Sequence, residues 1–265
     1  MLTLLSWLFV LLGIGTAISI ALDVRRCPQP MAIMNLTWPI TGLYMPVIGW
    51  WAYRQMGRTS RSAPQHQGHA SHGDEAPDQA SHDDAHAHRG HADQARSPQA
   101  DSHQAHHGEA HAHHHGTDKP KWQGVFVSAT HCGGGCTLGD VVTAPLATAT
   151  GFALFGSTTA GHFLLAFIGA YLFGVLFQYL PIRAMSGAGP LQAFKDAIKA
   201  DTLSLIAFQI GMYVWMLIAL NAWLGEMNAF NIHFWFMMQI AMLIGFATSY
   251  PANWLLIDRG IKHAM

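Results

Sequence analysis

Long apolar blocks alternate with short polar connections along most of the chain. Five of these blocks are apolar for about 18 residues or more, the length that a helix needs to cross the hydrocarbon core of a bilayer. A sixth block is apolar apart from one carboxylate and a few hydroxyls. The pattern therefore predicts six membrane spans. They cover residues 2–22, 31–53, 138–156, 163–180, 203–224 and 232–257.

One long polar segment interrupts this pattern. Residues 57–121 are mainly Ser, Gln, Ala, Asp, Pro and His, and fourteen of the chain's 18 histidines lie between His66 and His115. The segment has too little apolar surface to offset the entropy of ordering it, so we predict a disordered loop. The chain then divides into three parts. These are two N-terminal transmembrane helices in residues 1–56, the disordered His-rich loop in 57–121 and a four-helix membrane domain in 122–265.

The composition also favours a membrane protein. Hydrophobic residues make up 51% of the chain and charged residues only 11%, which is not the balance of a soluble domain. The net charge is −1, and no basic stripe interleaved with aromatic residues indicates a nucleic-acid partner. Three cysteines are too few for a disulfide scaffold. We therefore expect an all-α, polytopic helical bundle whose main partner is the lipid bilayer, with a homo-oligomer or a membrane-complex partner left open.

The orientation is predicted from the basic residues near the ends of the spans, because Lys and Arg concentrate in cytoplasmic loops. With six spans and a cytoplasmic N-terminus, ten of twelve such residues face the cytoplasm. Only Arg25 and Arg26, in the first loop, face outward and oppose this arrangement. We therefore expect a multi-pass protein of the cell membrane, with both termini and the His-rich loop in the cytoplasm.

Several long strings of low probability fill the chain from about Trp122 to its end. They are "SATHCGGGCTLGD", "KADTLSLIAFQIGMYVWM", "FWFMMQI", "SYPANW" and "RGIKHAM". Through these strings the chain resembles a family of prokaryotic integral membrane proteins catalogued as domain of unknown function 4396. The resemblance implies a helical membrane domain. It brings no activity, substrate or catalytic residue, so the function, including whether the protein is an enzyme, has to be argued from the residues themselves.

The string "ATHCGGGCTLGD" places metal-binding side chains around three glycines. If Thr137 and Asp140 form a capping box, Cys136 lies just before a helix N-terminus, where the helix dipole favours a thiolate. The glycines would then let Cys132 fold back toward Cys136. Two sulfurs and a neighbouring imidazole suit copper(I) or zinc. The candidate metal ligands are His131, Cys132, Cys136 and Asp140.

The sequence allows two other interpretations of this string. The glycines and cysteines form a structural turn in the first, with Asp140 as a helix cap and the thiols as small hydrophobic groups. In the second, Cys132 and Cys136 form a thiol redox pair. Asp201, at the entry to the fifth predicted span, is a further ionisable candidate, with a solvated surface role as its alternative.

Other potential ligands lie near the outer ends of the spans and within them. His162 and His233 could converge as ligands for an exiting ion or as axial ligands of a haem, which is the second cofactor candidate after copper or zinc. Methionines recur at a four-residue spacing, which puts thioethers on one helix face, where they can pass copper(I) along or simply fill gaps in the core. The pairs are Met212 with Met216 and Met238 with Met242.

The histidine tract adds many weak sites for divalent transition metals at a high local concentration. Together with the thiol string, it predicts a membrane protein that binds or moves a transition metal, either copper or zinc or nickel. Two alternatives belong to other classes. The protein could be a membrane thiol-redox or haem-binding protein, or a structural or assembly partner without a metal role.

Overall fold

The computed structural model describes residues 1–58, 120–187 and 189–262, and these contain helices and no β-strand. The expected all-α class is therefore confirmed. Of the disordered loop predicted over residues 57–121, residues 59–119 lie outside the described residues, whereas Gly57 and Lys121 at its two ends are helical. The helices are α1 (Leu2–Arg26), α2 (Met34–Tyr44), α3 (Pro46–Ala52), α4 (Lys121–Thr150), α5 (Thr158–Ser186), α6 (Pro190–Ala219) and α7 (Ile232–Asp258), with π-helical turns at Tyr53–Gly57 and Leu220–Leu224.

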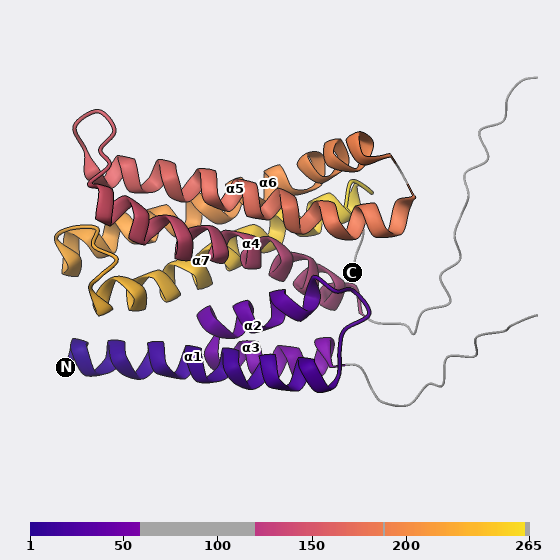
Figure 1. Ribbon diagram of the computed structural model, residues 1–265, viewed down its shortest axis with the longest axis horizontal. Coiled ribbons are helices and arrows are strands. Elements are labelled where there is room, and N and C mark those ends of the chain that lie inside the picture. Colours follow the sequence, from indigo (N-terminus) through magenta and orange to yellow (C-terminus); the bar gives the residue numbers. More distant parts are fainter. Residues whose placement is uncertain (59–119, 188, 263–265) are drawn as a thin grey trace, which may run out of the picture. The chain divides into compact units, whose positions relative to one another are not determined.

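Helices α4 to α7 form an antiparallel bundle in which consecutive helices are neighbours (Figure 1). Helix α4 is its central element, because it packs against α2, α5, α6 and α7. Every residue of α4 from Val127 to Thr137 is buried. The polar side chains of this stretch therefore face other helices and not lipid.

Within the described residues, four helices are long and apolar enough to cross a membrane. They are α1, α5, α6 with its π-helical turn, and α7. Helix α4 is more polar, but its 30 residues extend along the whole of α7. At one end Lys121 pairs with Asp258, and at the other the Thr148 hydroxyl accepts a hydrogen bond from the Ala229 N–H. A membrane that contains α7 therefore also contains α4.

The predicted second span, over residues 31–53, is wrong. Helix α2 ends before Met45, whose backbone angles (φ −121°, ψ 73°) are not helical, and α3 starts at Pro46. Proline has no N–H and its φ suits the first position of a new helix, so the break falls just before it. The chain then reverses, and Gly49 of α3 packs directly on Gly42 of α2.

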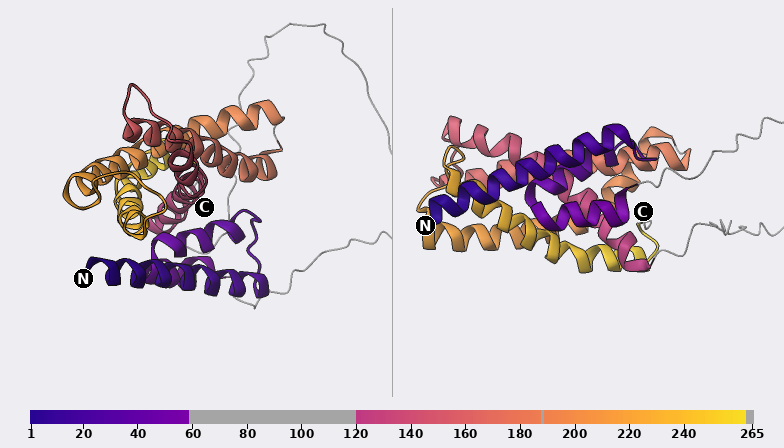
Figure 2. Two further views of the ribbon diagram at one scale, coloured as in Figure 1. Left: turned by 60° about the vertical axis from the view of Figure 1, so that its left-hand side comes forward. Right: turned by 90° about the horizontal axis from the view of Figure 1, so that it is seen from below.

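The two short helices form a hairpin that enters and leaves at the same end of the bundle (Figure 2). After α3, Tyr53 donates a hydrogen bond to Asp23, near the end of α1, and Arg58 pairs with the same carboxylate at 3.3 Å. The tip of the hairpin contacts α1 near its middle, where the Leu43 carbonyl meets Gly13. Residues 31–53 thus reach part of the way along α1 and return, so they do not cross.

Because the hairpin does not cross, the first and last described helices start from the same end of the bundle. Thr3, in the first turn of α1, lies 3.2 Å from the ring of His233 at the start of α7. Lys262 follows the other end of α7, which is 27 residues or about 40 Å long. Thr3 and Lys262 therefore lie at opposite ends of the bundle, and not on one side as the predicted six spans require (Figure 1).

The predicted third span, over residues 138–156, begins too late. Helix α4 starts at Lys121 and passes through the three glycines without a turn. The glycines serve close helix packing, because a Cβ on Gly135 would lie 2.6 Å from the Cα of Gly174 in α5. Gly139 approaches the backbone of Ala170 in the same way. Small residues let helix backbones approach each other closely in membranes, which explains a glycine run inside a helix.

Candidate functional site

Cys136 lies in the middle of α4, so the prediction that it precedes a helix N-terminus is wrong. Thr137 does not cap a helix, since its hydroxyl donates to the Gly133 carbonyl at 2.7 Å, four residues earlier. The helix dipole acts only within the first and last turns, so it gives no thiolate stabilisation at this position. Cys132 and Cys136 are buried free cysteines, and their thiols are neighbours.

The register of α4 divides the predicted metal ligands between two faces. Cys132, Cys136 and Asp140 recur every four residues, so they line one face at steps of about 6 Å. His131 points about 100° away from Cys132 around the helix axis. It is buried, and neither ring nitrogen has a hydrogen-bond partner within the described part of the chain. Among the described residues, no three His, Cys, Asp or Glu side chains come together as a ligand set.

Asp140 lies at a small cavity between α4, α5, α6 and α7. The cavity has a volume of about 10 Å³. That is room for a single water-sized particle and not for an organic ligand or a haem. Its chemistry is dominated by methionine sulfur, with one carboxyl and one imidazole. The lining residues with polar or sulfur atoms are Asp140, His162, Met212, Tyr213, Met216, Met227 and Met238.

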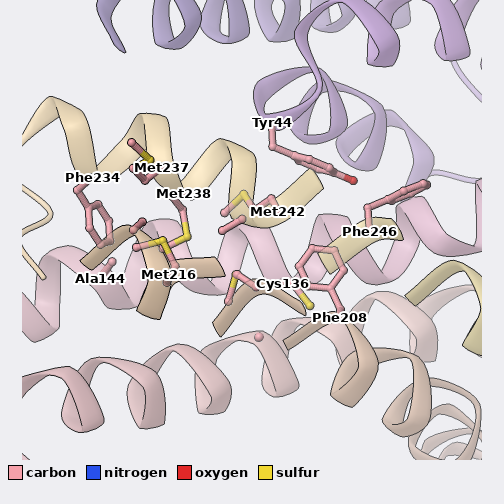
Figure 3. Packing of buried hydrophobic residues seen from close by; sticks show 14 of the residues in the cluster. Tyr44, Cys136, Ala144, Phe208, Met216, Phe234, Met237, Met238, Met242 and Phe246 are labelled. Carbon is pink, nitrogen blue, oxygen red and sulfur yellow. The ribbon is translucent and has the colours of Figure 1, made fainter. Parts of the chain in front are cut away.

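Sulfur atoms continue from this cavity along the interior (Figure 3). The side chains of Met216, Met238, Met242 and Cys136 point into the space shared by α4, α6 and α7, and all four are buried. The Met242 sulfur also lies 3.5 Å from the Thr137 hydroxyl. The helices therefore gather thioethers and thiols that are far apart in the sequence.

The Asp140 carboxyl is fully buried, and neither oxygen has a hydrogen-bond partner among the described residues. An isolated carboxylate in a dry interior costs several kcal/mol, so such a group requires a proton, a cation or water beside it. The cavity next to Asp140 is the space where a particle of that size fits.

The two histidines considered as a pair have different surroundings. His162, in α5, lines the cavity together with Asp140 and is 5% exposed. His233, at the start of α7, lies against Thr3 of α1 and does not line the cavity. The fold therefore joins His162 to the methionines of α6 and α7, and it gives His233 a contact with α1.

Sequence reasoning missed a buried cation. Lys262 has a fully buried side chain, and its ammonium donates a hydrogen bond to Asn253 at 2.8 Å and lies 3.8 Å from Asp201. In the sequence, Lys262 had the pattern of an exposed cytoplasmic lysine. Gly260 was the one local sign of its burial, because a glycine just past a helix often makes the left-handed turn that folds the chain back. Its φ of 66° shows that turn.

The fold and the buried polar interior define a class of protein, an integral helical membrane protein whose central helix carries the polar side chains. The family model described as a domain of unknown function (DUF4396) matches residues 121–262, more than half of the chain, so the protein belongs to that family. The matched region covers α4 to α7 and the C-terminal turn. Neither a curated protein nor a solved structure shows significant similarity to the chain.

Proposed function

We propose that the protein binds copper(I) inside the α4–α7 bundle and moves it through the membrane. The cavity lined by four methionines, His162 and Asp140 carries this proposal. Thioether sulfur is a soft ligand that selects copper(I), and imidazole also suits copper. A carboxylate beside the ion would balance its charge in a medium of low dielectric constant.

The same cavity favours copper(I) over the other metals and over the other classes of function. Zinc is bound by thiolate, imidazole and carboxylate, and thioethers are not among its usual ligands. Methionine also fills gaps in ordinary cores, which is the structural alternative. A gap-filling role explains the sulfur atoms. It does not explain a carboxyl that faces them without a hydrogen-bond partner among the described residues, because such a group only destabilises an inert core.

The distribution of charge supports an orientation with the N-terminus outside. Every described Lys and Arg lies at one end of the bundle, where α1, α5 and α7 end and α4 and α6 begin. By the positive-inside rule this end is cytoplasmic. Arg25 and Arg26 in the first loop then agree with the other basic residues. The reason is that the α2–α3 hairpin leaves the bundle at the same end at which it enters. The residues are Arg25, Arg26, Arg54, Arg58, Lys121, Arg183, Lys195, Lys199, Arg259 and Lys262.

In this orientation the His-rich loop is cytoplasmic, because both Arg58 and Lys121, which flank it, lie at the basic end. Its imidazoles would collect transition-metal ions there by their high local concentration. The ions would then meet the buried sulfur atoms of Cys136 and Met242 on the way to the cavity. Collection by imidazole and passage along sulfur are two separate roles within one chain.

The copper(I) site is tested by conservative changes of its thioethers. Met216→Leu keeps the size and apolarity of the side chain and removes the sulfur. We expect copper(I) affinity to fall about tenfold or more, since even supporting residues of metal sites command that range. The measurement is competition with a chromogenic copper(I) chelator, using full-length protein in which the fourteen loop histidines are serine.

Met237→Leu is the matched control, because Met237 is buried in α7 but does not line the cavity. It should leave the affinity unchanged. Equal affinities for the wild-type protein, Met216→Leu and Met212→Leu would rule out the thioether site. Such a result would favour the gap-filling interpretation of these methionines.

A further inference from the structure

The Lys262 ammonium lies in a buried pocket of oxygen atoms contributed by α6 and α7. The Asn253 carbonyl oxygen accepts its hydrogen bond at 2.8 Å, and the nearer oxygen of Asp201 is 3.8 Å away. The Ser204 hydroxyl lies 3.4 Å from that same Asp201 oxygen. A positive charge, two neutral oxygens and a carboxylate therefore share one enclosed site.

The C-terminal turn delivers this charge into the bundle. Past the end of α7, Gly260 takes a left-handed conformation. The N–H groups of Ile261 and Lys262 then both bond to the Leu256 carbonyl. This fold-back points the Lys262 side chain toward Asp201, and its exposed fraction is 0%. The Lys262 ammonium therefore belongs to the C-terminal turn and not to a membrane-spanning helix.

The pairing between Lys262 and Asp201 is incomplete. A close ion pair has shorter N–O distances than 3.8 Å, and the second Asp201 oxygen accepts no hydrogen bond from any residue that the structure describes. The Asn253 amide group donates to the Ser249 carbonyl, which fixes its own carbonyl oxygen toward the cation. These oxygens therefore have coordinating capacity that the ammonium does not use fully.

We propose that Asp201, Ser204 and Asn253 form a binding site for a small monovalent cation of the Na⁺ type, and that the Lys262 ammonium is a tethered competitor for it. Oxygen ligands, one of them charged, suit hard cations, and an ammonium carries the same charge as Na⁺. Binding of Na⁺ would displace Lys262 and free the C-terminal turn at the basic end of the bundle. This site differs from the methionine cavity in its residues and in the class of ion, and it does not depend on copper binding.

The test uses Lys262→Met, which keeps a long apolar side chain and removes the charge. Full-length purified protein is unfolded by heat at pH 8 in choline chloride, KCl or NaCl of equal ionic strength, without transition metals. In choline the variant is expected to unfold at a lower temperature than the wild type, because Asp201 has lost its counter-charge. Added Na⁺ should raise its unfolding temperature with a saturable dependence, by about 4 °C or more, whereas the wild type should respond little.

Two further variants complete the experiment. Lys121→Met removes a lysine from an exposed ion pair and should show no Na⁺ dependence. The double variant Lys262→Met with Asp201→Asn removes both charges, and it should fold without Na⁺ and ignore it. The proposal is overturned if Lys262→Met responds equally to choline, K⁺ and Na⁺, or if it recovers only at acidic pH. It is also overturned if the variant cannot be isolated folded in NaCl while the double variant can.

Discussion

Gly139→Ala is expected to destabilise the protein by about 3 kcal/mol or more, although it adds only one methyl group. A Cβ at this position would lie 2.4 Å from the backbone nitrogen of Ala170 and 2.5 Å from the backbone carbon of Gly169. Backbone atoms cannot rotate away as a side chain does, so α4 and α5 would have to separate. Separation would open the interface that holds Cys136 and Asp140 in register.

The effect is measured as the unfolding temperature of the purified protein and as the monodisperse fraction after solubilisation. Gly15→Ala is the matched control, because a Cβ at Gly15 in α1 meets nothing within 4 Å. Alanine is the better helix former, so this control should be neutral or more stable by about 0.5–1 kcal/mol. An unfolding temperature of Gly139→Ala equal to that of the wild type would contradict the close approach of α4 and α5.

The crossing helices α1, α5, α6 and α7 were predictable because length and apolarity together report on the bilayer. The hairpin was not, since residues 31–53 are as apolar and as long as a true span. Only the direction of the chain after Pro46 distinguishes a crossing from a return. That direction depends on contacts with distant residues, such as Asp23 with Arg58 and Gly13 with Leu43.

The turn predicted at the three glycines of α4 was wrong for a related reason. Three glycines in succession normally weaken a helix by about 1 kcal/mol each, so a turn was the reasonable local interpretation. The helix persists because α5 presents Gly169, Ala170 and Gly174 to it, more than thirty positions later in the chain. Once α4 is continuous, the common face of Cys132 and Asp140 follows from their eight-residue separation alone.

The methionine pairs were visible as a four-residue repeat, but their meeting with Asp140 and His162 was not. That meeting requires α5, α6 and α7 to converge on one face of α4, which is a property of the tertiary structure. The burial of Lys262 could not be predicted for the same reason, because the local composition near the chain end does not indicate whether a charge is buried. Spacing therefore identified the kinds of ligand, and packing decided which of them meet.

Two buried carboxyls of the bundle are expected to respond differently to the same substitution. Asp201→Asn leaves the Lys262 ammonium buried without its counter-charge, and breaking a buried pair in this way costs about 3–5 kcal/mol. Asp140→Asn breaks no interaction between described residues, because neither Asp140 oxygen has a partner. It should therefore leave the unfolding temperature of metal-free protein unchanged, and Asp140→Leu should raise it.

Copper(I) affinity should show the reverse order. Asp140→Asn is expected to weaken copper(I) binding about tenfold or more, since it removes the charge that faces the cavity. The Asp201→Asn protein that remains folded should bind copper(I) as tightly as the wild type. Both variants are compared by thermal unfolding without metal and by chelator competition, in protein whose fourteen loop histidines are serine. If Asp140→Asn lowers stability and leaves affinity intact, the carboxyl is a structural group, and copper binding in this cavity loses its charged ligand. A carboxyl that costs stability in the metal-free protein and supplies affinity in the loaded one is what an ion site inside a membrane bundle requires.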